Sequence, residues 1–379
     1  MNKKIFIKNI KDIKFLKYKE VMNNIINANP DYKNLKNSDV ILFGAAEMGK
    51  RFLNLLNGNV KVVAFCDNNS NLWGGGINGV KIISPDELLN NYHKNMNIII
   101  TSESFTEIQK QLEIMGFINV FSYLFLTIID SGKYEVPHSS NMIKSFFKNR
   151  GKIKKLYNNL EDQRSKEVLF TILNARLNLD YSQLTGICEK NQYFDEGIIK
   201  IKPGEIFIDG GAYIGDTIES CIGQYNGRIS KIYAFEPDIN NYKKLCMKLK
   251  NKDNIKTITI RKGLFSCTKK VNYIFQGLDS RISSNGTRQI YVVSMDDYFK
   301  NKRVSFIKLD IEGAEQDALI GAKKIIEEQM PKMAVCVYHK PNDLWEVPLL
   351  IKSINKKYKI YLRHYSTYLY ETVCYAVVH

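Results

Sequence analysis

The chain lacks the features that define disulfide-rich, zinc-knuckle and membrane-spanning proteins. Its 7 cysteines are dispersed without one Cys-x-x-Cys pair, which argues against both a disulfide framework and a zinc knuckle. Its most apolar run, residues 120–129, is about half of the roughly 20 residues that a spanning helix needs. Lysines interrupt the amino-terminal sequence MNKKIFIKNIKDIKF, so it lacks the apolar stretch of a signal peptide. These absences favour a soluble, cytoplasmic protein with reduced thiols.

Proline is scarce, at 8 residues, and 44% of the residues are hydrophobic, which is typical of a globular chain. A length of 379 residues suits two domains. Acidic residues are in the minority, because 39 Asp and Glu stand against 55 Lys and Arg, which gives a net charge of +16. This excess favours an acidic partner. The basic stretches lack the interleaved aromatics of a strand-binding groove, so we expect no nucleic-acid partner.

Residues 1–37 have the pattern of a basic helical arm. Ile7, Ile10, Ile13 and Leu16 recur near helical spacing, with lysines between them. Such a helix could make a peripheral contact with an anionic membrane surface. It could equally dock its apolar stripe on the body of the protein or on a second copy of the chain, so a homo-oligomer is open. We favour docking.

Residues 38–127 alternate short apolar runs with amphipathic segments, which predicts a small parallel sheet with helices on both faces. After its first strand, Gly44, Ala46 and Gly49 form the pattern Gly-x-Ala-x-x-Gly, and Asp67 ends the next strand. This is the dinucleotide fingerprint with alanine in place of its middle glycine. The added methyl group narrows the approach of a pyrophosphate without forbidding it.

The segments ILFGAAEMGKR, VAFCDNN and INGVKIISPDELL also resemble a Rossmann-like nucleotide-binding domain found beside sugar-modifying enzymes. Three interpretations stay open for this domain. It could bind the nucleotide of a nucleotide-sugar, bind NAD, or serve as a scaffold or dimerisation surface. A Tyr-x-x-x-Lys pair for hydride transfer is not evident in residues 38–127, which disfavours an oxidoreductase.

Residues 128–200 show no strand pattern and predict a helical, basic connector. Residues 201–379 form a second α/β series. Its last two strands follow the final helix with a short polar connection, so we expect an antiparallel hairpin and a reversed edge strand. That ending is typical of the common class I methyltransferase sheet. The expected fold is therefore α/β with two Rossmann-like domains.

In the second domain, residues 209–215 spell Asp-Gly-Gly-Ala-Tyr-Ile-Gly at a strand-to-helix turn. The spacing differs from that of pyrophosphate loops and suits a phosphate-poor nucleoside with an aminoacyl tail. Glu236 ends the next strand, where a carboxylate can accept hydrogen bonds from ribose hydroxyls. The cofactor-binding residues predicted from these positions and the next strand are Asp209, Gly211, Ala212, Gly215, Glu236 and Asp310.

Asp310 and Glu312 follow another buried strand, so they should point into the same cleft. These carboxylates could hold the cofactor amine, orient a hydroxyl, act as a base or bind a divalent metal, and the sequence leaves the choice open. His339 follows the next strand, where a base with a pKa near the working pH would be useful. Asp310, Glu312 and His339 are the predicted catalytic residues.

Five segments, IFIDGGAYIGDT, YAFEPD, VVSMDDYF, FIKLDIEGAE and YHKPNDLWEVP, occur in this order within residues 200–379. Together they resemble the FkbM-type family of S-adenosylmethionine-dependent methyltransferases. The resemblance implies methyl transfer from S-adenosylmethionine to a hydroxyl, usually of a sugar or a polyketide-type product. It also implies that Asp209, Gly211 and Gly215 line the cofactor loop and that Glu236 binds the ribose.

Four further residues are predicted to contact the acceptor. Arg281 lies in a polar loop, residues 277–286, that could be a lid. Trp345 could present an apolar platform to a sugar, although core packing explains it equally well. Arg363 and His364, at the end of a later strand, could meet an anionic group.

We therefore expect an O-methyltransferase that acts on a sugar or saccharide, free or nucleotide-linked, in surface-polysaccharide or natural-product biosynthesis. The alternatives are a nucleotide-sugar-binding scaffold with an inactive methyltransferase half, and an NAD-dependent sugar oxidoreductase that uses the first domain.

Overall fold

The computed structural model describes residues 4–29, 35, 38–56, 60–102, 104–129, 141–225, 227–250, 256–274, 281–282 and 286–378. The chain divides into two compact units. The first unit comprises Met1–Arg150, Phe170–Gly186 and Thr367–Leu369, and the second comprises Gly151–Leu169, Ile187–Ser366 and Tyr370–His379. The predicted connector, residues 128–200, is therefore not a separate part. Its segments are shared between the two units.

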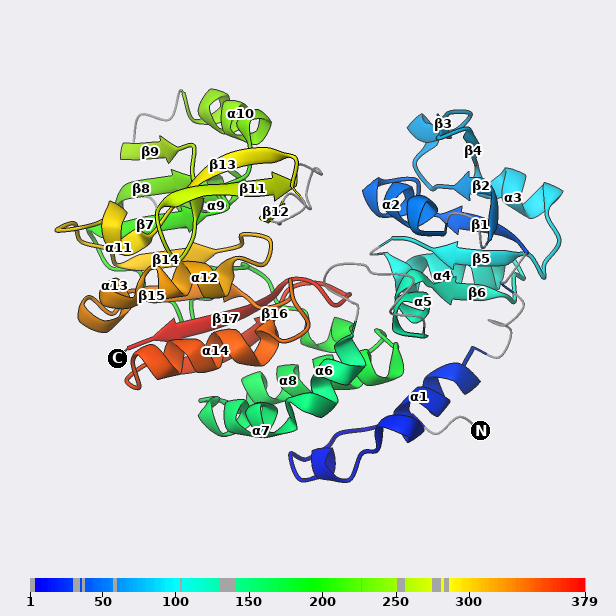
Figure 1. The fold of residues 1–379 in the computed structure, drawn as a ribbon, viewed down its shortest axis with the longest axis horizontal. Coiled ribbons are helices and arrows are strands. Elements are labelled where there is room, and N and C mark those ends of the chain that lie inside the picture. The colour runs from blue at the N-terminus through cyan, green and yellow to red at the C-terminus, as the bar shows by residue number, and fades with distance from the viewer. Residues whose placement is uncertain are drawn as a thin grey trace. The chain divides into compact units, whose positions relative to one another are not determined.

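The first unit contains a six-stranded sheet with the order β3-β4-β2-β1-β5-β6 (Figure 1). Its strands are β1 (Asp39–Phe43), β2 (Lys61–Cys66), β3 (Gly76–Ile77), β4 (Val80–Ile83), β5 (Asn97–Ile100) and β6 (Val120–Ser122). All neighbours pair in parallel except β3 with β4. The helices are α2 (Glu47–Leu56), α3 (Pro85–Asn91), α4 (Phe105–Ile114) and α5 (Tyr123–Ile129). The apolar run 120–129 is thus a short strand followed by a helix.

The amino-terminal segment differs from the predicted helical arm. In its described part, helix is found at the short turn η1 (Asp12–Lys14) and at α1 (Tyr18–Asn27), and the residues before η1 are not helical. Ile5 and Ile7 exchange backbone hydrogen bonds with the side-chain amides of Asn178 and Asn174, at 2.7–3.2 Å. Two residues of extended chain span nearly the same distance as one helical turn, so every second residue of the segment meets the next turn of the helix. The segment docks within its own unit in an extended form.

Those asparagines lie on α8 (Gln163–Asn178), which follows α6 (Met142–Lys148) and α7 (Arg150–Asn159). The helices carry the basic side chains of residues 144–155. Some of these charges already have protein partners: Lys152 pairs with Glu346 at 2.6 Å, and Arg150 donates to the carbonyl of Leu16 at 3.2 Å. Among the described residues, no helix is both long enough and apolar enough to cross a membrane.

The second unit contains a seven-stranded sheet with the order β16-β17-β15-β14-β7-β8-β9 (Figure 1). Its strands are β7 (Glu205–Gly210), β8 (Ile229–Phe235), β9 (Lys256–Ile260), β14 (Phe306–Leu309), β15 (Lys332–Cys336), β16 (Lys359–His364) and β17 (Thr372–Val377). Only β17 runs antiparallel to its neighbours. The hairpin expected at this end is confirmed. The reversed strand, however, is β17, second from the edge, and β16 forms the edge.

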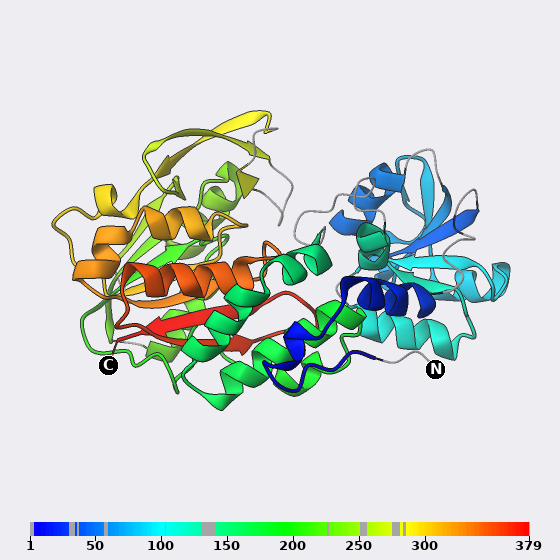
Figure 2. The same ribbon diagram turned by 60° about the horizontal axis from the view of Figure 1, so that its bottom comes forward.

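Helices cover both faces of this sheet. Three helices, α12 (Glu315–Ile320), α13 (Lys323–Glu328) and α14 (Asp343–Ile354), lie together on one face, and α14 runs along β17 (Figure 2). On the other face, α9 (Asp216–Tyr225) and α10 (Ile239–Leu249) contribute to a core built around Phe194, Phe207 and Phe306. The parallel strands therefore have buried side chains on both sides, which explains their continuous apolar sequences.

A small mixed sheet is inserted between β9 and β14, with the order β10-β13-β11-β12. Its strands are β10 (Gly263–Leu264), β11 (Lys269–Ile274), β12 (Arg281–Ile282) and β13 (Arg288–Val293), and α11 (Met295–Tyr298) follows. Arg281 pairs through its backbone with Ile274, and its side chain lies outside the described residues. Most of the predicted lid, residues 277–286, also lies outside them.

Candidate active site

The glycine loop after β7 is held between β8 and β14 by its own backbone. The amides of Gly211 and Ala212 both donate to the carbonyl of Phe235 at 3.0 Å. A Cβ on Gly211, whose φ is +76°, would lie 1.8 Å from the carbonyl oxygen of Asp310. A Cβ on Gly215, whose φ is +91°, would meet Leu245 at 3.0 Å. Glycine at 211 is therefore required by contact with the neighbouring strand end, before any ligand is considered.

Asp209 lies beneath this loop. Its carboxylate is fully buried and lies 3.0 Å from the ammonium of Lys308, which is also buried. Lys308 donates in addition to the carbonyls of Gly210 and Gly211, at 3.3 and 2.9 Å. Burial raises the pKa of Asp209 to about 6, although Lys308 opposes this. With Lys308, Asp209 supports the loop from within, and its contact with a cofactor stays a prediction.

Lys308 was not among the predicted site residues. The signal was present in the sequence, since a lysine in the middle of the apolar strand FIKLD must be buried with a partner. Burial alone would lower the pKa of Lys308, but Asp209 and Asp310 raise it, so the ammonium stays charged.

Glu236, at the end of β8, joins its strand to the glycine loop. Its side chain is buried and accepts hydrogen bonds from the amides of Tyr213 at 3.0 Å and Asp238 at 2.8 Å. Burial raises its pKa to about 7, against the opposing effect of these two hydrogen bonds. Each carboxylate oxygen still has a lone pair for a further donor.

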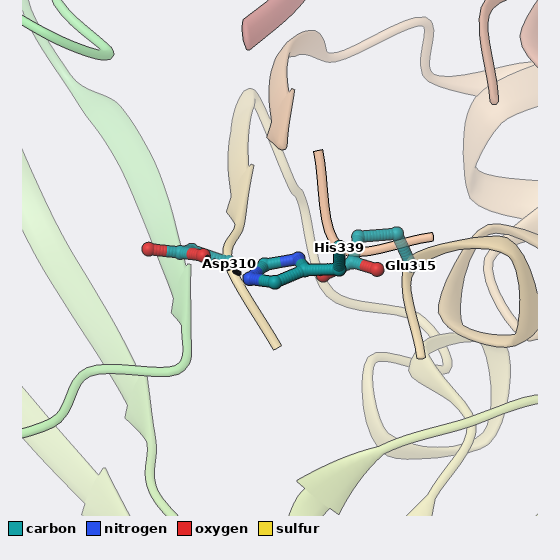
Figure 3. Close-up of side chains that lie close together, drawn as sticks. All are labelled: Asp310, Glu315 and His339. Carbon is teal, nitrogen blue, oxygen red and sulfur yellow. Dashed lines mark ion pairs between the residues drawn. The ribbon is translucent and has the colours of Figure 1, made fainter. Parts of the chain in front are cut away.

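A cluster of carboxylates surrounds His339 at the ends of β14 and β15 (Figure 3). The imidazole Nδ1 lies 2.9 Å from Glu315, and Nε2 lies 3.4 Å from Asp310 and 3.6 Å from Glu312. Glu315 is fully buried and accepts hydrogen bonds from the amides of Ile311 and Gly313. Asp310, Glu312 and His339 are thus brought together as predicted. Glu315 was missed, although it stands three residues after Glu312.

The charge state of His339 differs from the expected one. Burial alone would lower the pKa of its imidazole, but the adjacent Glu315, and then Glu312 and Asp310, raise it to about 10. The imidazole therefore carries a proton near neutral pH in this arrangement. Burial would raise the pKa of Asp310, but Lys308 and His339 lower it, and Asp310 also accepts hydrogen bonds from Tyr193 and Tyr338.

Three residues predicted to contact the acceptor are engaged within the protein. The side chain of Trp345 is 1% exposed and belongs to the core, so it offers no platform. Arg363 pairs with Asp162 at 2.7 Å and Asp195 at 3.3 Å. His364 is fully buried, with Nδ1 2.9 Å from the hydroxyl of Thr372. The sequence places Arg363 and His364 at the end of a strand, but it does not show that this strand, β16, lies at the edge of the sheet, away from β7 and β8.

The glycine loop of the first unit is built on the same plan. Gly44 has a φ of +119°, and the carboxylate of Asp67 accepts a hydrogen bond from the amide of Ala45 at 2.7 Å. A Cβ on Gly49 would lie 2.0 Å from the carbonyl oxygen of Gly44, so glycine permits close packing of helix and loop. The side chain of Ala46 is exposed.

Comparison with known proteins gives a family match within each unit. Residues 36–119 match the model of the C2185-like, N-terminal family, and residues 209–359 match the model of the methyltransferase FkbM domain. No curated protein matches the chain. The structure is similar to that of methyltransferase FkbM from Methylobacillus flagellatus KT, with a TM-score of 0.78 and 21% identity, over 97% of this chain and 100% of that one.

Two weaker structural similarities each cover about half of this chain. An rRNA methylase from Streptococcus thermophilus has a TM-score of 0.31 and 13% identity, over 54% of this chain and 96% of that one. Aeropyrum pernix fibrillarin, in complex with S-adenosyl-L-methionine, has a TM-score of 0.32 and 14% identity, over 52% and 74%. On the family match, residues 209–359 form an S-adenosylmethionine-dependent methyltransferase domain of FkbM type.

Proposed function

We propose that this protein transfers the methyl group of S-adenosylmethionine to a hydroxyl of a sugar or saccharide, free or nucleotide-linked. The observation that carries the proposal is the convergence of three features at the carboxyl ends of β7, β8, β14 and β15. They are the glycine loop, the buried acid Glu236, and the cluster of Asp310, Glu312 and His339. Ligands of open α/β sheets bind at this edge.

The residues present fit the methyl donor. The amide of Tyr213 holds the side chain of Glu236, so the loop and this predicted ribose ligand are fixed together. Glu236 keeps lone pairs for ribose hydroxyls. Glycine at 211 and 215 lets the loop pack closely against Asp310 and Leu245, which fixes its shape beside Glu236. When bound, S-adenosylmethionine supplies an activated methyl group, so the chain's own residues need only bind, orient and deprotonate the acceptor.

The acceptor side is acidic, which suits a hydroxyl-bearing substrate. The side chains of Asp310 and Glu312 are 24% and 31% exposed, so they can accept hydrogen bonds from hydroxyls that enter the site. His339 holds its own proton here, so the proton of the acceptor hydroxyl passes to one of these carboxylates. The protonated imidazole between them holds their positions. A sugar, with several adjacent hydroxyls, can use more than one such acceptor at once.

For the first unit we propose binding of a nucleotide, as part of a nucleotide-linked acceptor, at the loop of Gly44, Ala46 and Gly49. Trp73 supports this role, because its indole is 43% exposed and its Nε1 donates to the carbonyl of Asp67 at 2.7 Å. The indole is thereby fixed beside the strand end where a ribose would be bound, and its face can stack on a base.

Calorimetry with S-adenosylhomocysteine, on the wild type and on Glu236→Gln, tests the donor site. Binding to the wild type that is weakened at least tenfold in the variant supports the proposal, and no heat with the wild type refutes it. The exposed Glu328→Gln is the control and should bind as the wild type does.

Incubation with S-adenosylmethionine and a panel of nucleotide-sugars and oligosaccharides, followed by mass spectrometry, tests the acceptor. A methyl-sized mass gain that disappears in Asp310→Asn is expected. A scaffold would bind nucleotide-sugars without any mass gain, and an NAD-dependent enzyme would instead bind NADH in a manner abolished by Gly44→Val.

A further inference from the structure

We propose that the second unit binds a small organic phosphate in a pocket at the edge of its sheet opposite the glycine loop. The pocket has a volume of about 520 Å³. It is lined by residues at the beginnings of β7, β14 and β15 and at the end of β17, which runs the other way. The glycine loop and Asp310 follow the other ends of β7 and β14, so the pocket is separate from the proposed methyl-transfer site.

Cationic side chains outnumber acidic ones around this pocket. Of the described residues that line it, the charged ones are Lys200, Lys202, Glu205, Arg303 and Lys332. Four cations and one acid around a single hollow give it a positive potential, which attracts an anion.

The acid of the pocket is already neutralised within the protein. Glu205 is 2% exposed, and its carboxylate accepts hydrogen bonds from the ammonium of Lys332 and, at 3.1 Å, from the backbone amide of Lys202. Burial raises the pKa of Glu205, but the hydrogen bond from Lys332 and others lower it below its usual value, so the carboxylate stays ionised. The pair of Glu205 and Lys332 therefore leaves the other cations of the pocket without an acidic partner there.

Lys202 and Arg303 are the cations available to a ligand. The ammonium of Lys200 donates to the carbonyl of Glu196. Within the described part of the chain, the side chains of Lys202 and Arg303 have no hydrogen-bond or ion-pair partner. The guanidinium is a planar fork that can hold two oxygens of a phosphate, and the ammonium adds a point charge. Both side chains are exposed, so a ligand can reach them from solvent.

The rest of the lining indicates that the ligand has an organic part. Val304, Met330 and Val377 contribute apolar surface to the pocket. Sites for small molecules are typically roughly 300–1,000 Å³ and combine apolar walls with a few polar groups. The amide of Val304 donates to the side-chain oxygen of Gln329 at 2.7 Å, which fixes the wall before a ligand binds. A bare phosphate ion would leave this apolar surface in contact with water, whereas an organic phosphate would cover it.

Calorimetry of the full chain with phenyl phosphate and with inorganic phosphate tests the proposal. The buffer contains about 0.15 M salt, which screens the general attraction of a chain of net charge +16 for anions. We expect one phenyl phosphate per chain, bound about tenfold more tightly than inorganic phosphate because the ring adds apolar contact. Arg303→Gln and Lys202→Gln should each weaken this binding about fivefold, since each removes one charge-assisted contact.

The control is Lys243→Gln, which removes the same charge from an exposed position on α10 and should bind as the wild type does. Lys332 is kept, because its substitution would leave the buried carboxylate of Glu205 without its counter-ion. Thermal unfolding of each variant checks its folding.

Three calorimetric results would overturn the proposal: no binding at millimolar phenyl phosphate, equal binding by Arg303→Gln, or equal affinity for the two phosphates. Displacement of phenyl phosphate by S-adenosylhomocysteine would also overturn it, because the probe would then lie in the donor site. Binding to vesicles of phosphatidylglycerol that Arg303→Gln removes, without binding of phenyl phosphate, would assign the pocket to a lipid surface instead. Phenyl phosphate binding without S-adenosylhomocysteine binding supports the pocket and refutes only the donor site.

Discussion

The buried pair of Asp209 and Lys308 leads to a quantitative prediction for Lys308→Met. The substitution leaves a fully buried carboxylate without its counter-ion, and breaking a buried pair from one side costs about 3–5 kcal/mol. At pH 7 the lone carboxyl would take up a proton. Because the pKa of Asp209 is already about 6 in the wild type, this proton uptake adds about 1.4 kcal/mol at pH 7 to the loss of the contacts of Lys308.

The loss also depends on pH, with a definite sign. The wild-type pKa of Asp209 is raised to about 6, so above pH 6 native and unfolded wild type both hold this carboxyl ionised. In Lys308→Met the native state keeps one more proton than the unfolded state in that range. The variant's stability therefore falls relative to the wild type, by about 1.4 kcal/mol for each pH unit above 6. Between pH 4 and 6 both native states bind the proton, and the difference is nearly constant.

Urea unfolding at pH 6 and pH 7.5 measures this effect. The chain has two tryptophans, Trp73 and Trp345, and only Trp345 is buried in the second unit. In a Trp73→Phe background its fluorescence reports the unfolding of that unit alone. Lys323→Met is the matched control, because its ion pair is largely exposed and contributes about 0–1 kcal/mol. A loss below 1 kcal/mol for Lys308→Met, or a loss that does not grow with pH, would refute the reasoning.

Three further predictions follow from single contacts. Affinity for S-adenosylhomocysteine should fall as the pH drops below the Glu236 pKa of about 7, since the carboxylate is the form that accepts hydroxyl donors, and calorimetry on Glu236→Gln should show no such pH dependence. Gly211→Ala should abolish this binding, because its Cβ would overlap a backbone carbonyl, whereas Gly223→Ala, with open space, should bind normally and gain about 0.5–1 kcal/mol in urea unfolding. Asn178→Ala should release the segment around Ile5, and limited proteolysis should cut there faster than in the wild type.

Much of the fold was predictable because its determinants are local. The alternation of apolar runs and amphipathic segments predicted both parallel sheets, and the positions of Glu236 and Asp310 at strand ends followed from it. The helical arm was right only for α1, because Ile5 and Ile7 lie in an extended segment whose backbone partners are on α8, 167 or more positions away. The spacing of apolar residues within the arm gives no information about a binding partner on α8.

Side-chain roles within the site were less predictable, since they depend on pairs distant in sequence. Arg363 is ion-paired with Asp162, 201 positions earlier, and Asp209 is ion-paired with Lys308 on another strand. A motif identifies which residues gather at the strand ends. It does not say which of them face a ligand and which support the loop, because that depends on charge partners from other strands.

The two glycine loops show why catalysis belongs to the second unit. In both, a strand-end acid accepts a hydrogen bond from a loop amide: Asp67 from Ala45 and Glu236 from Tyr213. An acid at this place therefore has a structural reason before any ligand binds, and it cannot by itself distinguish a binding domain from an enzyme.

The two units differ at the strand on the other side of the loop-bearing strand. That strand is β14, beside β7, in the second unit, and β5, beside β1, in the first. After β14 comes the carboxylate of Asp310, beside His339, whereas after β5 comes Thr101, whose hydroxyl donates back to the loop carbonyl. Of the described residues directly after β5, Thr101 and Ser102, neither carries a group that takes up a proton near neutral pH. The end of β14 thus offers groups that can take up a proton, and the described residues directly after β5 do not.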